Sequence, residues 1–251
     1  MHDEGRGRSA RQPAINIPGV VIGLIGAFVA AHLARLYLFD EADFLLRYAL
    51  IPARYTVEGY PGGIGAMVWT PLTYAFIHAD WTHLAVNSLW LAVFGTAMGR
   101  RFGTARLLLF GAVCAVAGAP AHYLGNAGDT APVVGASAAV SGMMAGACRF
   151  MFSAPRAVLV YGPHGAMVVH RQPALSLIGM FRNPRALAFL AIWFVLNLGM
   201  GLGSAEFLTG GVEIAWEAHI GGFLAGLLLF PLFDPVPTTA GAPPPPRAPA
   251  A

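Results

Sequence analysis

Residues 135–148 read GASAAVSGMMAGAC, an uncharged stretch in which small side chains recur at every fourth position. These small residues are Ala138, Gly142 and Gly146. Residues 214–233 repeat the same spacing at Ala218, Gly222 and Gly226. Positions four apart share one side of a helix, and small residues there let membrane helices approach closely. We therefore expect the two segments to pack against each other as helices.

The chain as a whole is strongly apolar. Of its 251 residues, 57% are hydrophobic and 11% are charged, which excludes an ordinary soluble domain. A span needs about 20 apolar residues to cross about 30 Å of hydrocarbon. Such runs cover residues 18–39, 80–99, 105–125, 134–152, 186–203 and 214–233. The predicted fold class is an all-α polytopic membrane protein, a bundle of six transmembrane helices with both termini on one side.

The apolar runs define a membrane domain at residues 18–233. The segment 1–17 precedes it, and the Pro- and Ala-rich segment 234–251 is expected to be a disordered tail. The first run is too long for a signal-peptide core, so we expect it to be retained. The connection at residues 40–77 is expected to lie partly in the outer interface. In the connection at 153–185, Val158 to Val160 and Met167 to Val169 are expected to form a weak hairpin.

The arginines predict the orientation, since loops on the cytoplasmic side are enriched in basic residues. The chain contains no lysine. One face collects Arg6, Arg8, Arg11, Arg100, Arg101, Arg106, Arg149, Arg156, Arg171, Arg182, Arg185 and Arg247. The opposite face collects Asp40, Glu41, Asp43, Glu58, Asp80, Asp129, Glu206, Glu213 and Glu217, with Arg47 and Arg54 as exceptions. Both termini are thus expected to be cytoplasmic. The compact six-span layout and the Ala-rich, lysine-free composition favour a bacterial cytoplasmic (inner) membrane. Dispersed arginines without aromatic platforms argue against nucleic acid as a partner.

Four polar side chains stand out near the outer ends of three apolar runs. His83 and Asn87 are four apart and share a helix face. Ser137 opens the fourth run, and His219 lies near the start of the last one. All three runs enter the membrane from the same side, so these side chains are expected at one depth. Polar groups inside a bilayer are costly and usually serve a function.

These residue types suit nucleophilic catalysis. If the two small-residue stripes meet, Ser137 Oγ could reach a ring nitrogen of His219, which would act as general base and then as general acid. The backbone N–H of Ser137, the His83 ring and the Asn87 amide could bind a developing oxyanion, at about 3 to 4 kcal/mol per important donor. Each residue alone has a structural alternative: serine bonds its own helix backbone, and histidine or asparagine ties helices together.

Together these residues resemble the rhomboid family of intramembrane serine proteases. The resemblance rests on His78, His83 and Asn87 in the second run, on Gly135, Ala136 and Ser137 in the fourth, and on Ala218, His219, Gly222 and Gly226 in the last. It implies a Ser137–His219 dyad without a triad aspartate. Separately, no cofactor or metal is expected. His83 and Asn87 would then help the Ser137 amide bind the oxyanion. His78, Gly135, Gly222 and Gly226 would support the site.

The resemblance also implies the partners. Substrates would be transmembrane proteins held among membrane lipids, cut near the outer ends of their helices, often after a small residue. This chain has Ala138 where the family usually has glycine, and Trp69-Thr70 where a Trp-Arg pair is frequent. It has Ser141 where a bulky aromatic often stacks on the catalytic histidine, which leaves open what holds His219.

Other hypotheses remain open at this level. A non-catalytic rhomboid-like protein could hold transmembrane helices without cutting them, and a solute channel would need a continuous polar path. A zinc site from His78, His83 and His219 lacks the His-Glu-x-x-His pattern. Several residues are assigned no catalytic role. Glu217 is expected to point away from the site, Asn197 and Trp193 to serve packing, and Cys114 and Cys148 to be free thiols, while His32 and His122 have no partner pattern.

Overall fold

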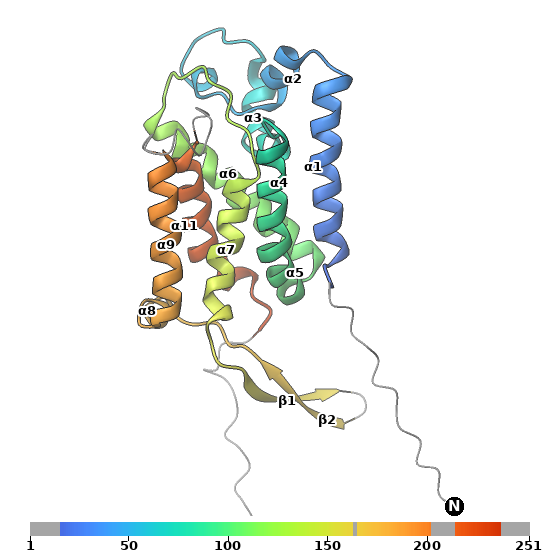
Figure 1. The fold of residues 1–251 in the computed structure, drawn as a ribbon, viewed down its shortest axis with the longest axis vertical. Coiled ribbons are helices and arrows are strands. Elements are labelled where there is room, and N and C mark those ends of the chain that lie inside the picture. Colours follow the sequence, from blue (N-terminus) through green and yellow to red (C-terminus); the bar gives the residue numbers. More distant parts are fainter. Residues whose placement is uncertain (1–15, 163–164, 202–213, 237–251) are drawn as a thin grey trace, which may run out of the picture.

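The computed structural model describes residues 16–162, 165–201 and 214–236, most of them in helices that stand side by side (Figure 1). Each predicted apolar run contains one helix of this bundle. The helices are α1 (Gly19–Tyr37), α4 (Trp81–Trp90), α6 (Thr104–Gly125), α7 (Ser137–Met151), α9 (Pro184–Gly201) and α11 (Trp216–Phe233). By length and composition α1, α6 and α11 can cross a membrane, and α9 is a shorter apolar helix. The predicted class, an all-α polytopic membrane protein, is confirmed.

The second run stays helical beyond α4. It continues through a π-helical segment, η3 (Leu91–Gly95), into α5 (Thr96–Phe102). Asp80 caps its start, because the Asp80 carboxylate accepts a hydrogen bond from the backbone N–H of His83 at 2.8 Å. This cap fixes His83 in the first turn of α4, at the upper end of the bundle in Figure 1.

Backbone contact between α7 and α11 forms the centre of the bundle. A Cβ added to Gly222 would collide with the carbonyl oxygen of Ala138, and one added to Gly226 with the carbonyl oxygen of Gly142. The α6 helix joins them, since a Cβ on Gly118 would lie 3.0 Å from the carbonyl oxygen of Ala218. The predicted contact between the two small-residue stripes is therefore confirmed. The helices touch without intervening side chains, as close membrane packing requires.

The connection between α1 and α4 covers the upper end of the bundle (Figure 1). Its elements are α2 (Glu41–Tyr48), η1 (Pro52–Tyr55), α3 (Gly63–Thr73) and η2 (Tyr74–Phe76). Arg54, 3% exposed, donates to the carbonyl of Ala49 at 3.1 Å and to the Thr70 hydroxyl at 3.3 Å. Trp69 Nε1 donates to the carbonyl of Arg47 at 2.7 Å. The Trp69-Thr70 part of the loop is thus anchored by an arginine from elsewhere in the same loop.

The lower end of the bundle carries a small hairpin (Figure 1). Strands β1 (Arg156–Gly162) and β2 (Gly165–Arg171) are antiparallel, and α8 (Leu177–Phe181) follows them. The register pairs Val158 with Val169 and Val160 with Met167, which confirms the predicted hairpin. The turn at residues 163–164 lies outside the described part of the chain.

Buried arginines close this lower end. Arg101 donates to both carboxylate oxygens of Asp234, each at 2.8 Å, and so joins the end of α5 to the chain after α11. Arg149 donates to the carbonyl of Leu227 at 3.0 Å. The domain boundaries and the state of the tail remain predictions, since residues 1–15 and 237–251 lie outside the described residues. So do six of the charges used for orientation, namely Arg6, Arg8, Arg11, Glu206, Glu213 and Arg247.

Candidate active site

Ser137 is the first residue of α7, and Gly135 shapes the chain just before it. Gly135 has φ +125°, a left-handed conformation that favours glycine. Its N–H donates to the carbonyl of Tyr74 at 3.0 Å, and the Tyr74 hydroxyl donates to the carbonyl of Ala115 on α6 at 2.9 Å. The first N–H groups of a helix have no partner inside it. The Ser137 N–H can therefore donate a hydrogen bond to a negatively charged oxygen.

The His83 ring lies next to the same glycine. A Cβ added to Gly135 would lie 2.7 Å from His83 Nε2 and 3.6 Å from Ser137 Oγ, so both groups border this one residue. On the other side of the ring, the backbone N–H of Ala79 donates to His83 Nδ1 at 3.4 Å. A neutral imidazole whose Nδ1 accepts carries its proton on Nε2. His83 can thus present an N–H donor beside Ser137.

Asn87 is buried one turn below His83, with 4% of its surface exposed. Its Nδ2 donates to the carbonyl of His83 at 3.0 Å, within the same helix. An amide group carries two N–H donors, so this bond leaves one for another acceptor. The predicted pairing of His83 and Asn87 on one face of α4 is confirmed, and the role of Asn87 as an oxyanion donor stays a prediction.

His219 lies on α11 at the depth of Ser137. It precedes Gly222 by one helical turn, and Gly222 packs against Ala138, the residue after Ser137. Both polar side chains are partly buried. The predicted common layer of Ser137, His83 and His219 at the upper end of the bundle is thus present. It is set by backbone contacts of α7 with α11 and by the turn at Gly135.

The expectation that Asn197 serves packing alone is wrong. Asn197 Oδ1 lies 2.6 Å from His219 Nδ1, and Asn197 Nδ2 lies 3.5 Å from the carbonyl oxygen of Trp216. Asn197 therefore connects α9 to α11 through the ring of His219. Trp193, one turn earlier, does pack as predicted, with its ring stacked on Phe223 at 4.8 Å between centroids. The missed signal was an amide in an otherwise apolar span, which is expensive unless it is bonded.

His78 lies behind the ring of His83. It is fully buried, and its ring packs against Phe28 and His83 at centroid distances of 5.1 and 5.2 Å. Neither ring nitrogen has a hydrogen-bond partner among the described residues. The carbonyl of His78 accepts a bond from His32 Nδ1 at 3.1 Å, a partner that the sequence pattern did not reveal. The position of His78 agrees with a supporting role in orienting the His83 ring.

Glu217 points away from the site, as predicted. Its carboxylate contacts His122 Nδ1 on α6 at 3.1 Å, and Asn126 Nδ2 donates to the carbonyl of His122 at 2.9 Å. His122 thus has partners that its sequence context did not suggest. The carboxylate of Glu217 is therefore paired with a histidine of α6.

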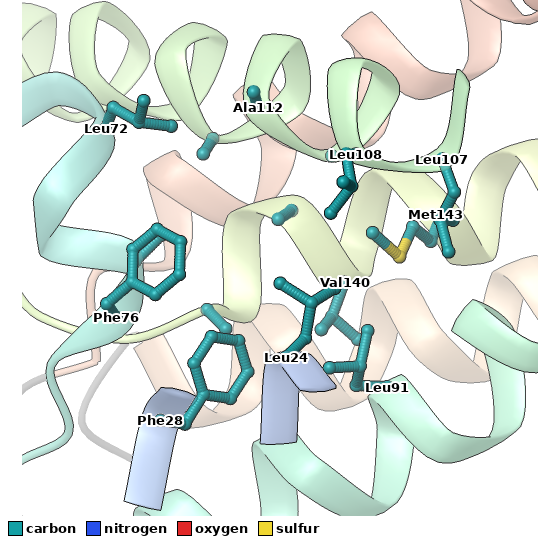
Figure 2. Close-up of a pocket in the computed structure, with 15 residues that line it drawn as sticks. Leu24, Phe28, Leu72, Phe76, Leu91, Leu107, Leu108, Ala112, Val140 and Met143 are labelled. Carbon is teal, nitrogen blue, oxygen red and sulfur yellow. The ribbon is translucent and has the colours of Figure 1, made fainter. Parts of the chain in front are cut away.

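An apolar cavity of about 220 Å³ borders α7 and is not lined by Ser137 (Figure 2). Ala136, which precedes α7, and Val140 and Met143 of α7 line it, together with residues of α1, α6 and η2, among them Phe28 and Phe76. Every lining side chain is apolar, so the cavity contributes no reacting group. Within the described ranges, no three His, Cys, Asp or Glu residues come together in a way that could hold a metal ion.

Comparisons with known proteins agree with this arrangement. The model of the Rhomboid domain family matches residues 65–234. The chain is also 34% identical over 203 residues to "Putative rhomboid protease YdcA" of Bacillus subtilis (strain 168). That alignment covers 80% of this chain and 84% of the relative. The family match at residues 65–234 includes the helices that carry His83, Ser137 and His219. The chain is therefore an integral membrane protein of the rhomboid family.

Proposed function

We propose that this protein is an intramembrane serine protease that hydrolyses peptide bonds in or near transmembrane segments, with Ser137 and His219 as its catalytic dyad. The observation that carries the proposal is the position of Ser137 Oγ beside Gly135 and His83, on a helix whose backbone touches that of His219. Membership of the rhomboid family supports the same class of activity. No cofactor or metal enters the scheme.

In this mechanism His219 Nε2 removes the proton from Ser137 Oγ as the oxygen attacks the scissile carbonyl carbon. The Ser137 N–H and His83 Nε2–H donate to the resulting oxyanion, with Asn87 as a further donor. His219 then gives its proton to the leaving amine, which breaks the C–N bond and leaves an acyl-serine. Water activated by His219 hydrolyses that ester and restores the serine.

The charge distribution supports a location with both termini in the cytoplasm of a bacterium. Arg100, Arg101 and Arg106 lie at the lower end of the bundle, as do Arg182 and Arg185 at the start of α9. The active-site layer at the upper end would then face the periplasmic or external side. Substrates would be transmembrane proteins that reach this layer from the surrounding lipid.

A serine-directed fluorophosphonate probe tests the proposal. We expect the purified protein to be labelled covalently, because His219 activates only one serine, and we expect labelling to vanish in Ser137→Ala and His219→Ala. Ser141→Ala is the matched control, since Ser141 is a buried serine one turn further along α7. Labelling that persists in Ser137→Ala would contradict the assignment. A folded parent that does not react would favour the non-catalytic helix-binding alternative.

Replacing Asn87 by alanine is expected to slow cleavage by about 10- to 100-fold without abolishing it, because other oxyanion donors remain. The measurement is the turnover of a transmembrane substrate in liposomes. Ser88→Ala serves as control, since the neighbouring Ser88 hydroxyl is buried and has no partner among the described residues. Turnover at the parent rate in Asn87→Ala would remove Asn87 from the proposed oxyanion hole.

A further inference from the structure

We propose that Asn197 is a positioning residue that holds His219 in the tautomer and orientation needed for general-base catalysis. This inference rests on the proposed Ser137–His219 dyad and adds to it a third residue from α9. Asn197 does not touch the substrate or the serine in this scheme. It acts on the reaction only through the imidazole ring of His219.

The hydrogen bonds of the Asn197 amide determine which atom faces the histidine. Asn197 Nδ2 faces the carbonyl oxygen of Trp216 at 3.5 Å, and that oxygen can only accept. The amide oxygen therefore faces His219 Nδ1, at 2.6 Å. Reversing the amide would place two acceptors against each other at Trp216. The Asn197 oxygen thus requires a proton on His219 Nδ1.

A proton on Nδ1 leaves Nε2 of the neutral ring unprotonated. That nitrogen is then free to take the proton of Ser137, which is the state a general base needs. In serine proteases an acceptor on Nδ1 performs this task by fixing the tautomer and the ring orientation. An uncharged amide can hold the same tautomer with no second charge inside the membrane, where a carboxylate would be expensive.

The burial of Asn197 makes this bond stable. Only 2% of Asn197 is exposed, so water does not compete for its amide. The Trp193–Phe223 stack, one turn away, is a separate contact between the same two helices. The bond from Asn197 also accounts for how His219 is held in a chain that has Ser141 where the family often has an aromatic residue. The ring is fixed from α9 by a hydrogen bond, and no aromatic side chain one turn after Ser137 is needed.

Kinetics of two Asn197 variants test the inference. Asn197→Leu removes the acceptor at nearly constant volume and should lower kcat by about 10- to 100-fold with KM little changed. Asn197→Asp keeps an acceptor oxygen for His219 Nδ1 but loses the N–H donor that faces the Trp216 carbonyl, so its kcat should lie between those of Asn197→Leu and the parent. Trp193→Leu is the matched control, since it weakens the contact of α9 with α11 without touching the hydrogen bond. Its kcat should stay near that of the parent. A parent-like kcat in Asn197→Leu, or equal losses in the Leu and Asp variants, would overturn the inference.

A spectroscopic measurement separates this inference from the proposed function. The ¹⁵N chemical shifts of the His219 ring report which nitrogen carries the proton, even in a protein that cleaves nothing. We expect the Nδ1–H tautomer in the parent and in Ser137→Ala, and a mixture of tautomers in Asn197→Leu. An unchanged tautomer in Asn197→Leu would overturn the positioning role even if the protein is an active protease. Failure of fluorophosphonate labelling, by contrast, would overturn the protease assignment.

Discussion

Replacement of Ser137 by alanine is expected to reduce proteolysis by about 10⁴-fold or more. The change removes the single oxygen that forms the acyl intermediate and leaves the backbone N–H of residue 137 in place. Ser137 is the first residue of α7, and the change removes only one oxygen atom, so the fold should persist. The measurement is cleavage of a purified single-pass membrane protein, reconstituted with the enzyme in liposomes.

Ser141→Ala provides the comparison for this experiment because it changes the same atom on the same helix. It should cleave at nearly the parent rate, and both variants should unfold at the same temperature. Cleavage by Ser137→Ala at more than about a hundredth of the parent rate would show that another group attacks the substrate.

Replacement of Gly222 by alanine is expected to destabilise the bundle by about 3 kcal/mol, the upper end of the usual range for overpacking. The new Cβ would collide with the carbonyl oxygen of Ala138, which belongs to the backbone and cannot rotate away. The helices α7 and α11 must then separate, which also moves His219 away from Ser137. The stability can be measured by unfolding in mixed detergent micelles, together with fluorophosphonate labelling.

Gly23→Ala on α1 is the matched control for this substitution, since no atom lies within 4 Å of the added Cβ. Alanine is a better helix former than glycine by about 1 kcal/mol, so this variant should be slightly more stable than the parent. Equal stability of the Gly222 and Gly23 variants would contradict the close contact of α7 with α11.

Features that depend on a single segment were predictable from the sequence. The apolar runs predicted the helices, and the four-residue spacing of small side chains predicted the close packing that brings Gly222 against Ala138. The shared face of His83 and Asn87 also follows from helical periodicity alone. The hairpin around residues 163–164 followed from prolines and glycines between two β-branched stretches.

Features that depend on how one helix is rotated against another were missed. Asn197 could have faced lipid, a neighbour or the cavity, and only the placement of α9 turns it toward His219. The contact of His122 with Glu217 depends on how α6 and α11 are rotated about their axes relative to each other. Both helices are apolar on all sides, so their sequences do not predict this rotation. The bond from Asn87 to the His83 carbonyl uses one of the two amide N–H groups, and the spacing of the two residues does not predict this bond.

The backbone contact of α7 with α11 has a consequence for how the protein responds to its bilayer. Gly222 and Gly226 of α11 lie against the backbone carbonyl groups of Ala138 and Gly142 on α7. If one helix slid along the other, larger side chains would meet these carbonyl groups, so the two helices cannot shift lengthwise without first separating. A thinner or thicker bilayer would therefore tilt α6, α7 and α11 as one rigid body. The serine and the histidine would change their depth together while keeping their separation, so lipid thickness would select where a substrate is cut before it altered how fast.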